Sequence, residues 1–135
     1  MSLAPFATPA PADQVDPRRP RVWLCESDPL FRALLGEWLQ RAGYESVRSA
    51  AAGAPAKDAV VVVADVPAPR QDGAASIAAL RQRFPSAKVL VISGQFMPGL
   101  HGLTTAAIEL GADAVLAKPF AADVFIDAVQ ALLRS

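Results

Sequence analysis

Residues 58–65 read Asp-Ala-Val-Val-Val-Val-Ala-Asp, an unbroken run of apolar and mostly β-branched residues between two aspartates. A run of this kind suits a strand in the middle of a parallel sheet, where helices cover both faces. Its last residue, Asp65, then lies at the carboxyl end of the strand. In open parallel sheets ligand groups collect at that edge. The stretch therefore predicts both a parallel sheet and the position of its ligand-binding edge.

The segments on either side alternate between short apolar runs and runs of helical period, which is typical of a parallel sheet flanked by helices. The predicted strands are residues 22–25, 45–49, 58–65, 88–93 and 114–118. One helix begins after Asp28-Pro29, a second runs from about Ala74 to Phe84, a third follows the loop 94–102, and the last occupies the C-terminus. We expect an α/β fold.

One connection is too short to hold a regular crossover helix. Only nine residues, Ala50 to Asp58, separate the second predicted strand from Ala59, whereas a parallel crossover with its helix needs about a dozen or more. Gly53 and Pro55 also oppose a helix there. We therefore expect an irregular loop and a second helix that is shortened or missing.

Composition limits the number of domains and the classes of partner. The chain has 135 residues, 53% of them hydrophobic and 19% charged, which suits one folded domain with a core. Thirteen basic and thirteen acidic residues cancel, so no basic excess points to nucleic acid or to a membrane surface. No apolar run approaches the roughly 20 residues of a membrane span, and no signal-peptide pattern begins the chain. A single cysteine, Cys25, agrees with a cytoplasmic location.

The first twenty residues differ in composition from the rest. They hold five prolines among alanines and few large apolar side chains, a composition that opposes helices and core formation. We expect residues 1–20 to form a flexible Pro/Ala-rich tail and residues 21–135 to form the domain.

Polar side chains stand at the ends of four predicted strands. Glu26-Ser27-Asp28 follows the first, Asp65 ends the third, Ser93 ends the fourth and Lys118-Pro119 ends the fifth. Because the carboxyl ends of parallel strands meet at one edge, these groups are expected to lie together. Carboxylates, a hydroxyl and a lysine suit a magnesium ion and a phosphoryl group, and a carboxylate can also attack phosphorus to form an acyl phosphate.

Two motifs resemble the receiver domain of two-component response regulators. The first is Asp65-Val-Pro-Ala-Pro-Arg-Gln-Asp-Gly73, with a proline four residues after the aspartate and then Asp-Gly. The second is Gly111-Ala-Asp-Ala-Val-Leu-Ala-Lys-Pro-Phe120. The resemblance covers residues 21–134 and implies a CheY-like, doubly wound sheet of five parallel strands in the flavodoxin-like order 2-1-3-4-5.

The resemblance also implies a role for each residue at the strand ends. Asp65 is the implied phosphoacceptor, and its carboxylate attacks the phosphohistidine of a sensor histidine kinase or phosphotransfer protein in line. Ser93 and Lys118 are the implied partners of the phosphoryl oxygens. Mg²⁺ is implied to bind Glu26, Asp65 and the backbone carbonyl of Pro67. Structural alternatives stay open, because serine often ends a strand and Glu26 could be a solvated loop acid.

Two positions depart from the family pattern. Ser27 stands where the family has a second acid, so one negative charge is lost and weak Mg²⁺ binding is expected. Asp28 lies one position late and is better suited to cap the following helix. Val115 stands where the family has an aromatic switch residue, and it cannot swing a ring between buried and exposed positions.

The function expected from these motifs is that of a stand-alone receiver. It accepts a phosphoryl group on Asp65, with self-catalysed phosphotransfer and dephosphorylation rather than conventional enzyme activity, and signals by binding a downstream protein. Only 17 residues follow Lys118, so no output domain is expected in this chain unless it is a fragment.

Two alternatives come from other classes of function. One is a pseudo-receiver, a phosphorylation-independent interaction module that uses the sheet face left bare by the lost helix, as a homodimer or with a partner helix. The other is a flavodoxin-like cofactor domain, which the absence of a phosphate-cradling loop after the first strand disfavours.

Overall fold

The computed structural model describes residues 19–48, 59–66, 69–95 and 100–134. The predicted tail lies almost wholly outside these residues, as do the predicted irregular loop, Pro67 and residues 96–99. The strands, the helices and most of the strand-end residues lie within them.

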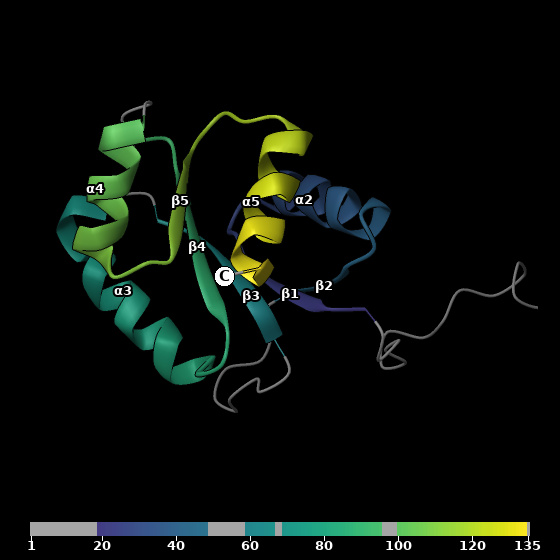
Figure 1. Cartoon of the computed structure of the whole chain (residues 1–135), viewed down its shortest axis with the longest axis horizontal. Coiled ribbons are helices and arrows are strands. Elements are labelled where there is room, and N and C mark those ends of the chain that lie inside the picture. The colour runs from purple at the N-terminus through teal and green to yellow at the C-terminus, as the bar shows by residue number, and fades with distance from the viewer. Residues whose placement is uncertain (1–18, 49–58, 67–68, 96–99, 135) are drawn as a thin grey trace, which may run out of the picture.

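Five parallel strands form a single sheet (Figure 1). They are β1 (Arg21–Cys25), β2 (Glu45–Arg48), β3 (Ala59–Asp65), β4 (Lys88–Ser93) and β5 (Ala114–Ala117). Their order is β2-β1-β3-β4-β5, which confirms the predicted order. The valine run lies in the central strand, where Val61, Val62 and Val63 are fully buried, because helices cover this part of the sheet from both sides.

Four helices among the described residues flank the sheet, two on each face (Figure 1). They are α2 (Pro29–Arg41), α3 (Pro69–Arg83), α4 (Leu100–Leu110) and α5 (Ala122–Arg134). Helices α2 and α5 pack on one face, and α3 and α4 on the other. The segment in which the second helix is expected to be shortened or missing lies outside the described residues. No helix in the described part of the chain is long and apolar enough to span a membrane.

Two helices begin earlier than the sequence pattern predicts. Helix α3 starts at Pro69 rather than near Ala74, so Asp72 lies in its first turn instead of in a preceding loop. Proline suits the first helical position because the amide it lacks has no partner there, and an acid in the first turn is favoured by the helix dipole. Helix α4 starts at Leu100, before Gly102, so the predicted loop 94–102 is shorter than expected.

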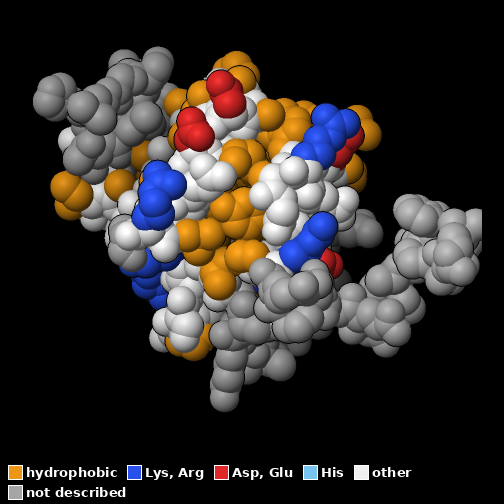
Figure 2. All heavy atoms as spheres, turned by 45° about the vertical axis from the view of Figure 1, so that its right-hand side comes forward, with side chains coloured by type: hydrophobic (Ala, Val, Ile, Leu, Met, Phe, Trp, Pro, Cys, Tyr) orange, Lys and Arg blue, Asp and Glu red, His pale blue; other side chains and the backbone are white. Residues whose placement is uncertain are grey.

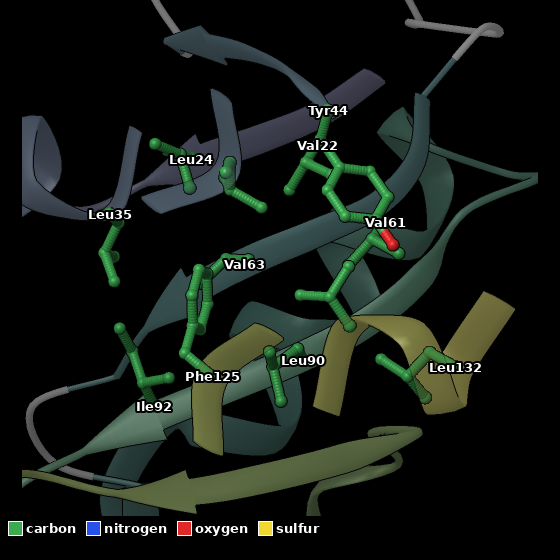
Figure 3. Close-up of a cluster of buried hydrophobic side chains, with 12 residues drawn as sticks. Val22, Leu24, Leu35, Tyr44, Val61, Val63, Leu90, Ile92, Phe125 and Leu132 are labelled. Atoms are coloured by element: carbon green, nitrogen blue, oxygen red, sulfur yellow. The ribbon is translucent and has the colours of Figure 1, made fainter. Parts of the chain in front are cut away.

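The larger core lies between the sheet and the α2 and α5 helices (Figure 3). Val22 and Leu24 of β1 alternate with half-buried neighbours, so both point to this side. Phe125 of α5 is fully buried in the same cluster. Its ring centroid lies 6.1 Å from that of Trp38 and 5.8 Å from that of Phe120. The rings connect this core to the edge at which β5 ends.

The face formed by α2 and α5 carries a groove with a volume of about 400 Å³. Figure 2 shows hydrophobic side chains along the middle of this face, with acidic and basic groups at its margins. The groove is lined by Trp38, Arg41, Ala42, Ala122, Asp123, Ile126, Asp127 and Gln130. None of these residues belongs to the group of polar strand-end residues.

Candidate functional site

Glu26 follows β1 and is held in a tight turn before α2. Its side-chain Oε2 accepts a hydrogen bond from the backbone N–H of Asp28 at 3.0 Å. Its backbone carbonyl accepts one from Nη1 of Arg32, also at 3.0 Å. Asp28 in turn caps α2, with Oδ1 3.0 Å from the backbone nitrogen of Leu30. The turn therefore fixes a carboxylate that is almost completely buried, since Glu26 is only 4% exposed.

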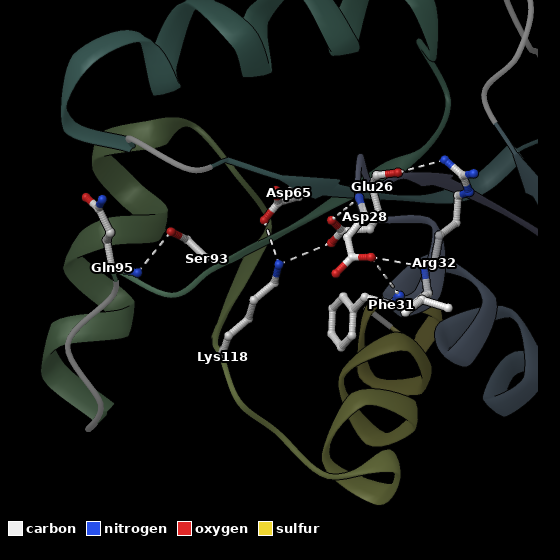
Figure 4. Close-up of polar contacts among 9 residues, drawn as sticks. Glu26, Asp28, Phe31, Arg32, Asp65, Ser93, Gln95 and Lys118 are labelled. Carbon is white, nitrogen blue, oxygen red and sulfur yellow. Dashed lines mark hydrogen bonds and ion pairs between the residues drawn. The ribbon is translucent and has the colours of Figure 1, made fainter.

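Lys118 joins the ends of three strands (Figure 4). Its Nζ lies 2.9 Å from Oδ1 of Asp65 and 3.2 Å from Oε1 of Glu26. The backbone N–H of Lys118 donates to the carbonyl oxygen of Ser93 at 2.9 Å, which keeps the residue in line with β4. One ammonium thus bridges two carboxylates that lie far apart in the sequence.

A fourth group completes the surroundings of the ammonium. The Lys118 Nζ lies 4.7 Å from the centroid of the Phe31 ring, a distance typical of a cation–π interaction. Phe31 lies in the first turn of α2, directly after the Asp28 cap. Helical spacing alone assigns Phe31 to the side that faces the core, so sequence reasoning missed this contact.

The Lys118 side chain is held in its charged form. Burial alone would lower the pKa of Lys118, but hydrogen bonds and charge interactions with Asp65 and Glu26 outweigh it and raise the pKa above its ordinary value of 10.5. A charged ammonium between two carboxylates offsets one of their two negative charges. The remaining negative charge of the cluster can attract a cation. The ammonium can in turn pair with an anionic group that is bound to one of the carboxylates.

Ser93 lies on the same edge of the sheet but is not part of the ion-pair cluster. It ends β4, is fully buried, and its Oγ accepts a hydrogen bond from the backbone N–H of Gln95 at 3.1 Å. Figure 4 shows it beyond Asp65, on the side away from Glu26. Because this hydroxyl acts as an acceptor, its O–H remains a donor for another oxygen.

The structure brings together three of the five predicted site residues. Glu26, Asp65 and Lys118 are in contact, Ser93 lies at the same edge, and Pro67 lies outside the described residues. Asp28 caps α2 as predicted, and this role engages the side chain that could have replaced the missing acid. Ser27 is exposed.

The carboxylate oxygens at this edge are of the type that binds divalent cations. Oxygens of Glu26 and Asp65 converge on a single positive group, and Mg²⁺ in proteins is often bound by one or two carboxylates while it keeps several waters. Across the described part of the chain, no cluster of three or more His, Cys, Asp or Glu side chains could hold a metal. Two carboxylates are thus the acidic ligands that this edge offers.

Comparisons with known proteins point to one family. Residues 22–130 match the family model described as "Response regulator receiver domain". The chemotaxis protein CheY of Listeria monocytogenes is 34% identical over 70 residues, which are 52% of this chain and 56% of that protein. The match therefore spans little more than half of the curated relative's length.

Two solved structures share the fold at low identity. A response regulator from Thermotoga maritima has a TM-score of 0.66 and 20% identity, over 87% of this chain and 99% of that one. A response regulator from Burkholderia pseudomallei has a TM-score of 0.58 and 23% identity, over 83% of this chain and 71% of that one. The latter structure holds a phosphorylated aspartic acid, a calcium ion and citrate.

Proposed function

The chain belongs to the family of response regulator receiver domains of two-component signalling, and we propose that it accepts a phosphoryl group on Asp65 from a sensor histidine kinase or phosphotransfer protein. In this proposal the phosphorylated form signals in the cytoplasm by binding a downstream protein. The observation that carries the proposal is the 2.9 Å contact between Lys118 Nζ and Asp65 Oδ1 at the carboxyl edge of the sheet.

The proposed transfer forms one bond to phosphorus and breaks another. A carboxylate oxygen of Asp65 attacks the phosphorus of a phosphohistidine, and the P–N bond breaks as its electron pair returns to the imidazole nitrogen. The product is an acyl phosphate on Asp65. Attack of water on that phosphorus, with loss of the carboxylate as the leaving group, releases inorganic phosphate and restores Asp65.

The neighbouring residues would stabilise the charge of the transferred group. Lys118 already lies beside Asp65, and its ammonium can shift from the carboxylate to the phosphoryl oxygens as negative charge moves onto them. The O–H of Ser93 is a suitable donor to one of these oxygens. Bound Mg²⁺ would supply additional positive charge, with Glu26, Asp65 and the carbonyl oxygen of Pro67 as its protein ligands.

Intact-mass analysis after incubation with Mg²⁺ and acetyl phosphate tests this function. Wild type is expected to gain one phosphoryl group and Asp65→Asn none, because the amide is not a nucleophile toward phosphorus. Asp72→Asn is the matched control, since Asp72 is an exposed acid in the first turn of α3, and it is expected to be modified like wild type. A folded wild type without modification, or an equally modified Asp65→Asn, would contradict the proposal.

A phosphorylation-independent pseudo-receiver is the second candidate function. Lys118 also engages Glu26, the acid implied to hold Mg²⁺, Ser27 supplies no second acid, and the buried Val115 occupies the position of the aromatic switch. All three features weaken phosphorylation or its transmission. For this function, partner capture from a lysate is expected to be equal for wild type and Asp65→Asn, with and without acetyl phosphate. The molar mass of the purified chain, measured by light scattering, would show whether it forms a homodimer.

A further inference from the structure

The Lys118 ammonium occupies the point at which two carboxylates converge. It lies 3.2 Å from Glu26 and 2.9 Å from Asp65. These are the same two side chains whose oxygens suit a divalent cation. The lysine and a metal ion would therefore approach the same acidic oxygens from the same region of space.

Glu26 leaves little freedom for a cation to bind elsewhere on its carboxylate. Its side chain is 2% exposed. Oε2 accepts from the Asp28 backbone N–H and Oε1 accepts from Lys118. A divalent cation on Oε1 would lie beside the ammonium, and like charges this close repel one another strongly in a partly buried site. The metal and the lysine can be bound together only if the ammonium moves away from Glu26.

Phe31 favours the ammonium in this position. The centroid of its ring lies 4.7 Å from the Lys118 Nζ, which sits over the face of the ring. The ring also makes an edge contact with Phe120, with centroids 5.7 Å apart, and its backbone N–H faces the Asp28 cap at 3.5 Å. The ring is thus held by α2 and by the residue two positions after Lys118, and it supplies a third attractive surface to the cation.

We propose that Lys118 and a divalent cation compete for Glu26, and that Phe31 is a positioning residue that shifts this competition toward the ammonium. The inference builds on the proposed function, because it concerns the same site. In the unphosphorylated protein, the ammonium of Lys118 rather than a metal ion is then the main positive charge beside Glu26 and Asp65. Weak metal binding then has two causes, the missing acid at Ser27 and the resident ammonium.

Binding of Mn²⁺ to the full chain, followed by the EPR signal of free Mn²⁺ at constant ionic strength, tests the competition. Mn²⁺ prefers the same oxygen ligands as Mg²⁺. Lys118→Met is expected to tighten Mn²⁺ binding roughly tenfold or more, because the metal no longer displaces a charge-assisted hydrogen bond. Phe31→Leu leaves every charge in place and is expected to tighten binding about two- to fivefold.

Two further variants control for net charge and for the identity of the site. Lys88→Met removes the same charge from the start of β4, at the opposite end of the strand from Ser93, and is expected to change binding by less than about twofold because of screening. Glu26→Gln is expected to weaken Mn²⁺ binding at least about tenfold, because the metal loses a carboxylate ligand. Far-UV circular dichroism checks that each variant is folded.

The proposal is overturned if folded Lys118→Met binds Mn²⁺ no more tightly than Lys88→Met, if Phe31→Leu binds like wild type, or if Glu26→Gln retains wild-type affinity. If Lys118→Met does not fold, Phe31→Leu decides alone. The titration contains no phosphodonor, so its outcome is independent of Asp65 phosphorylation. Failure of the phosphorylation experiment with the competition intact would refute only the proposed function.

Discussion

At the scale of single residues, the site depends on how Glu26 and Lys118 tolerate burial. A buried carboxylate is costly unless it is paired and hydrogen-bonded. Glu26 meets both conditions, with a backbone N–H on one oxygen and the lysine on the other. Lys118 carries a long apolar stem and keeps 26% of its side chain exposed. The ion pair is therefore reachable by a phosphoryl group while Glu26 stays protected.

The raised pKa of Lys118 predicts a loss of stability in alkaline solution. Because the folded-state pKa is above the ordinary value of 10.5, which applies to the unfolded chain, the charged lysine stabilises the fold fully below that pH. The contribution disappears as pH rises through the folded pKa. Urea midpoints measured from pH 8 to about 11.5 should fall more steeply for wild type than for Lys118→Met. Lys88→Met should follow wild type, and parallel curves for all three proteins would contradict the assignment.

At the scale of secondary structure elements, α2 depends on its N-terminal cap. Asp28 accepts from the backbone nitrogens of Leu30 and Phe31, and Pro29 follows at the first helical position, where its fixed φ suits the helix. Asp28→Ala is expected to lower the free energy of unfolding by about 1 kcal/mol, measured by urea denaturation. Asp28→Asn should retain most of the stability, because asparagine caps about as well. Equal losses for both variants would show that the side-chain acceptor is unimportant.

Arg81 connects α3 to the turn between α4 and β5. Its Nε and Nη2 donate to the carbonyl oxygen of Gly111 at 3.1 and 2.7 Å, and Nη2 also lies 3.0 Å from Oδ2 of Asp113. The same Oδ2 accepts from the backbone N–H of Val89 at 2.8 Å. Arg81 and Asp113 together thus fix a helix, a turn and the start of β4 relative to one another.

Arg81→Ala is expected to destabilise the protein by about 1 to 2 kcal/mol, because charged hydrogen bonds to a carbonyl and a carboxylate are lost together. Arg41→Ala is the matched control. Its ion pair with Glu37 is short, at 2.8 Å, but lies on an exposed helix surface. Such a pair contributes at most about 0.5 kcal/mol. Urea denaturation of both variants compares them directly, and equal effects would contradict the distinction.

At the scale of the whole molecule, the two faces of the sheet are unequal. The face covered by α2 and α5 holds the larger core and all three of the rings Trp38, Phe120 and Phe125. Phe120 also touches Phe31 at the ion-pair cluster. The core is therefore continuous with the surroundings of Lys118. A substitution that disturbs the packing of these rings is therefore expected to shift Phe31 and Lys118 as well.

Phe125→Ala is expected to lower the free energy of unfolding by about 3 to 5 kcal/mol, because it leaves a cavity in a fully buried cluster. Ile108→Ala on α4 is the control for loss of an apolar side chain. Ile108 is 75% exposed, so its truncation is expected to change stability by less than about 0.5 kcal/mol. Thermal or urea unfolding measures both. A loss below about 1 kcal/mol for Phe125→Ala would contradict the place of this ring in the core.

Local patterns in the sequence are sufficient to predict most of the elements. The valine run and Asp28-Pro29 each specify their structure through neighbouring residues. The start of α3 is different, because Asp72-Gly73 resembles a loop while Pro69 begins the helix. A glycine opposes a helix only by about 1 kcal/mol. Gly73 is buried in this helix, and Ile77 of the same helix packs against Val89 and Val91 of the sheet, so tertiary packing overrides the local preference.

The sequence alone determined the parallel sheet, its strand order through a family resemblance, and the set of residues at the carboxyl edge, because periodicity and strand ends are local properties of the chain. Only the tertiary structure decided that Lys118 bridges Glu26 as well as Asp65, and that Phe31 lies against its ammonium. These contacts depend on the spacing of β1, β3 and β5 and on the direction in which α2 leaves the sheet. Such distances arise from packing between segments remote in sequence, which no local pattern encodes.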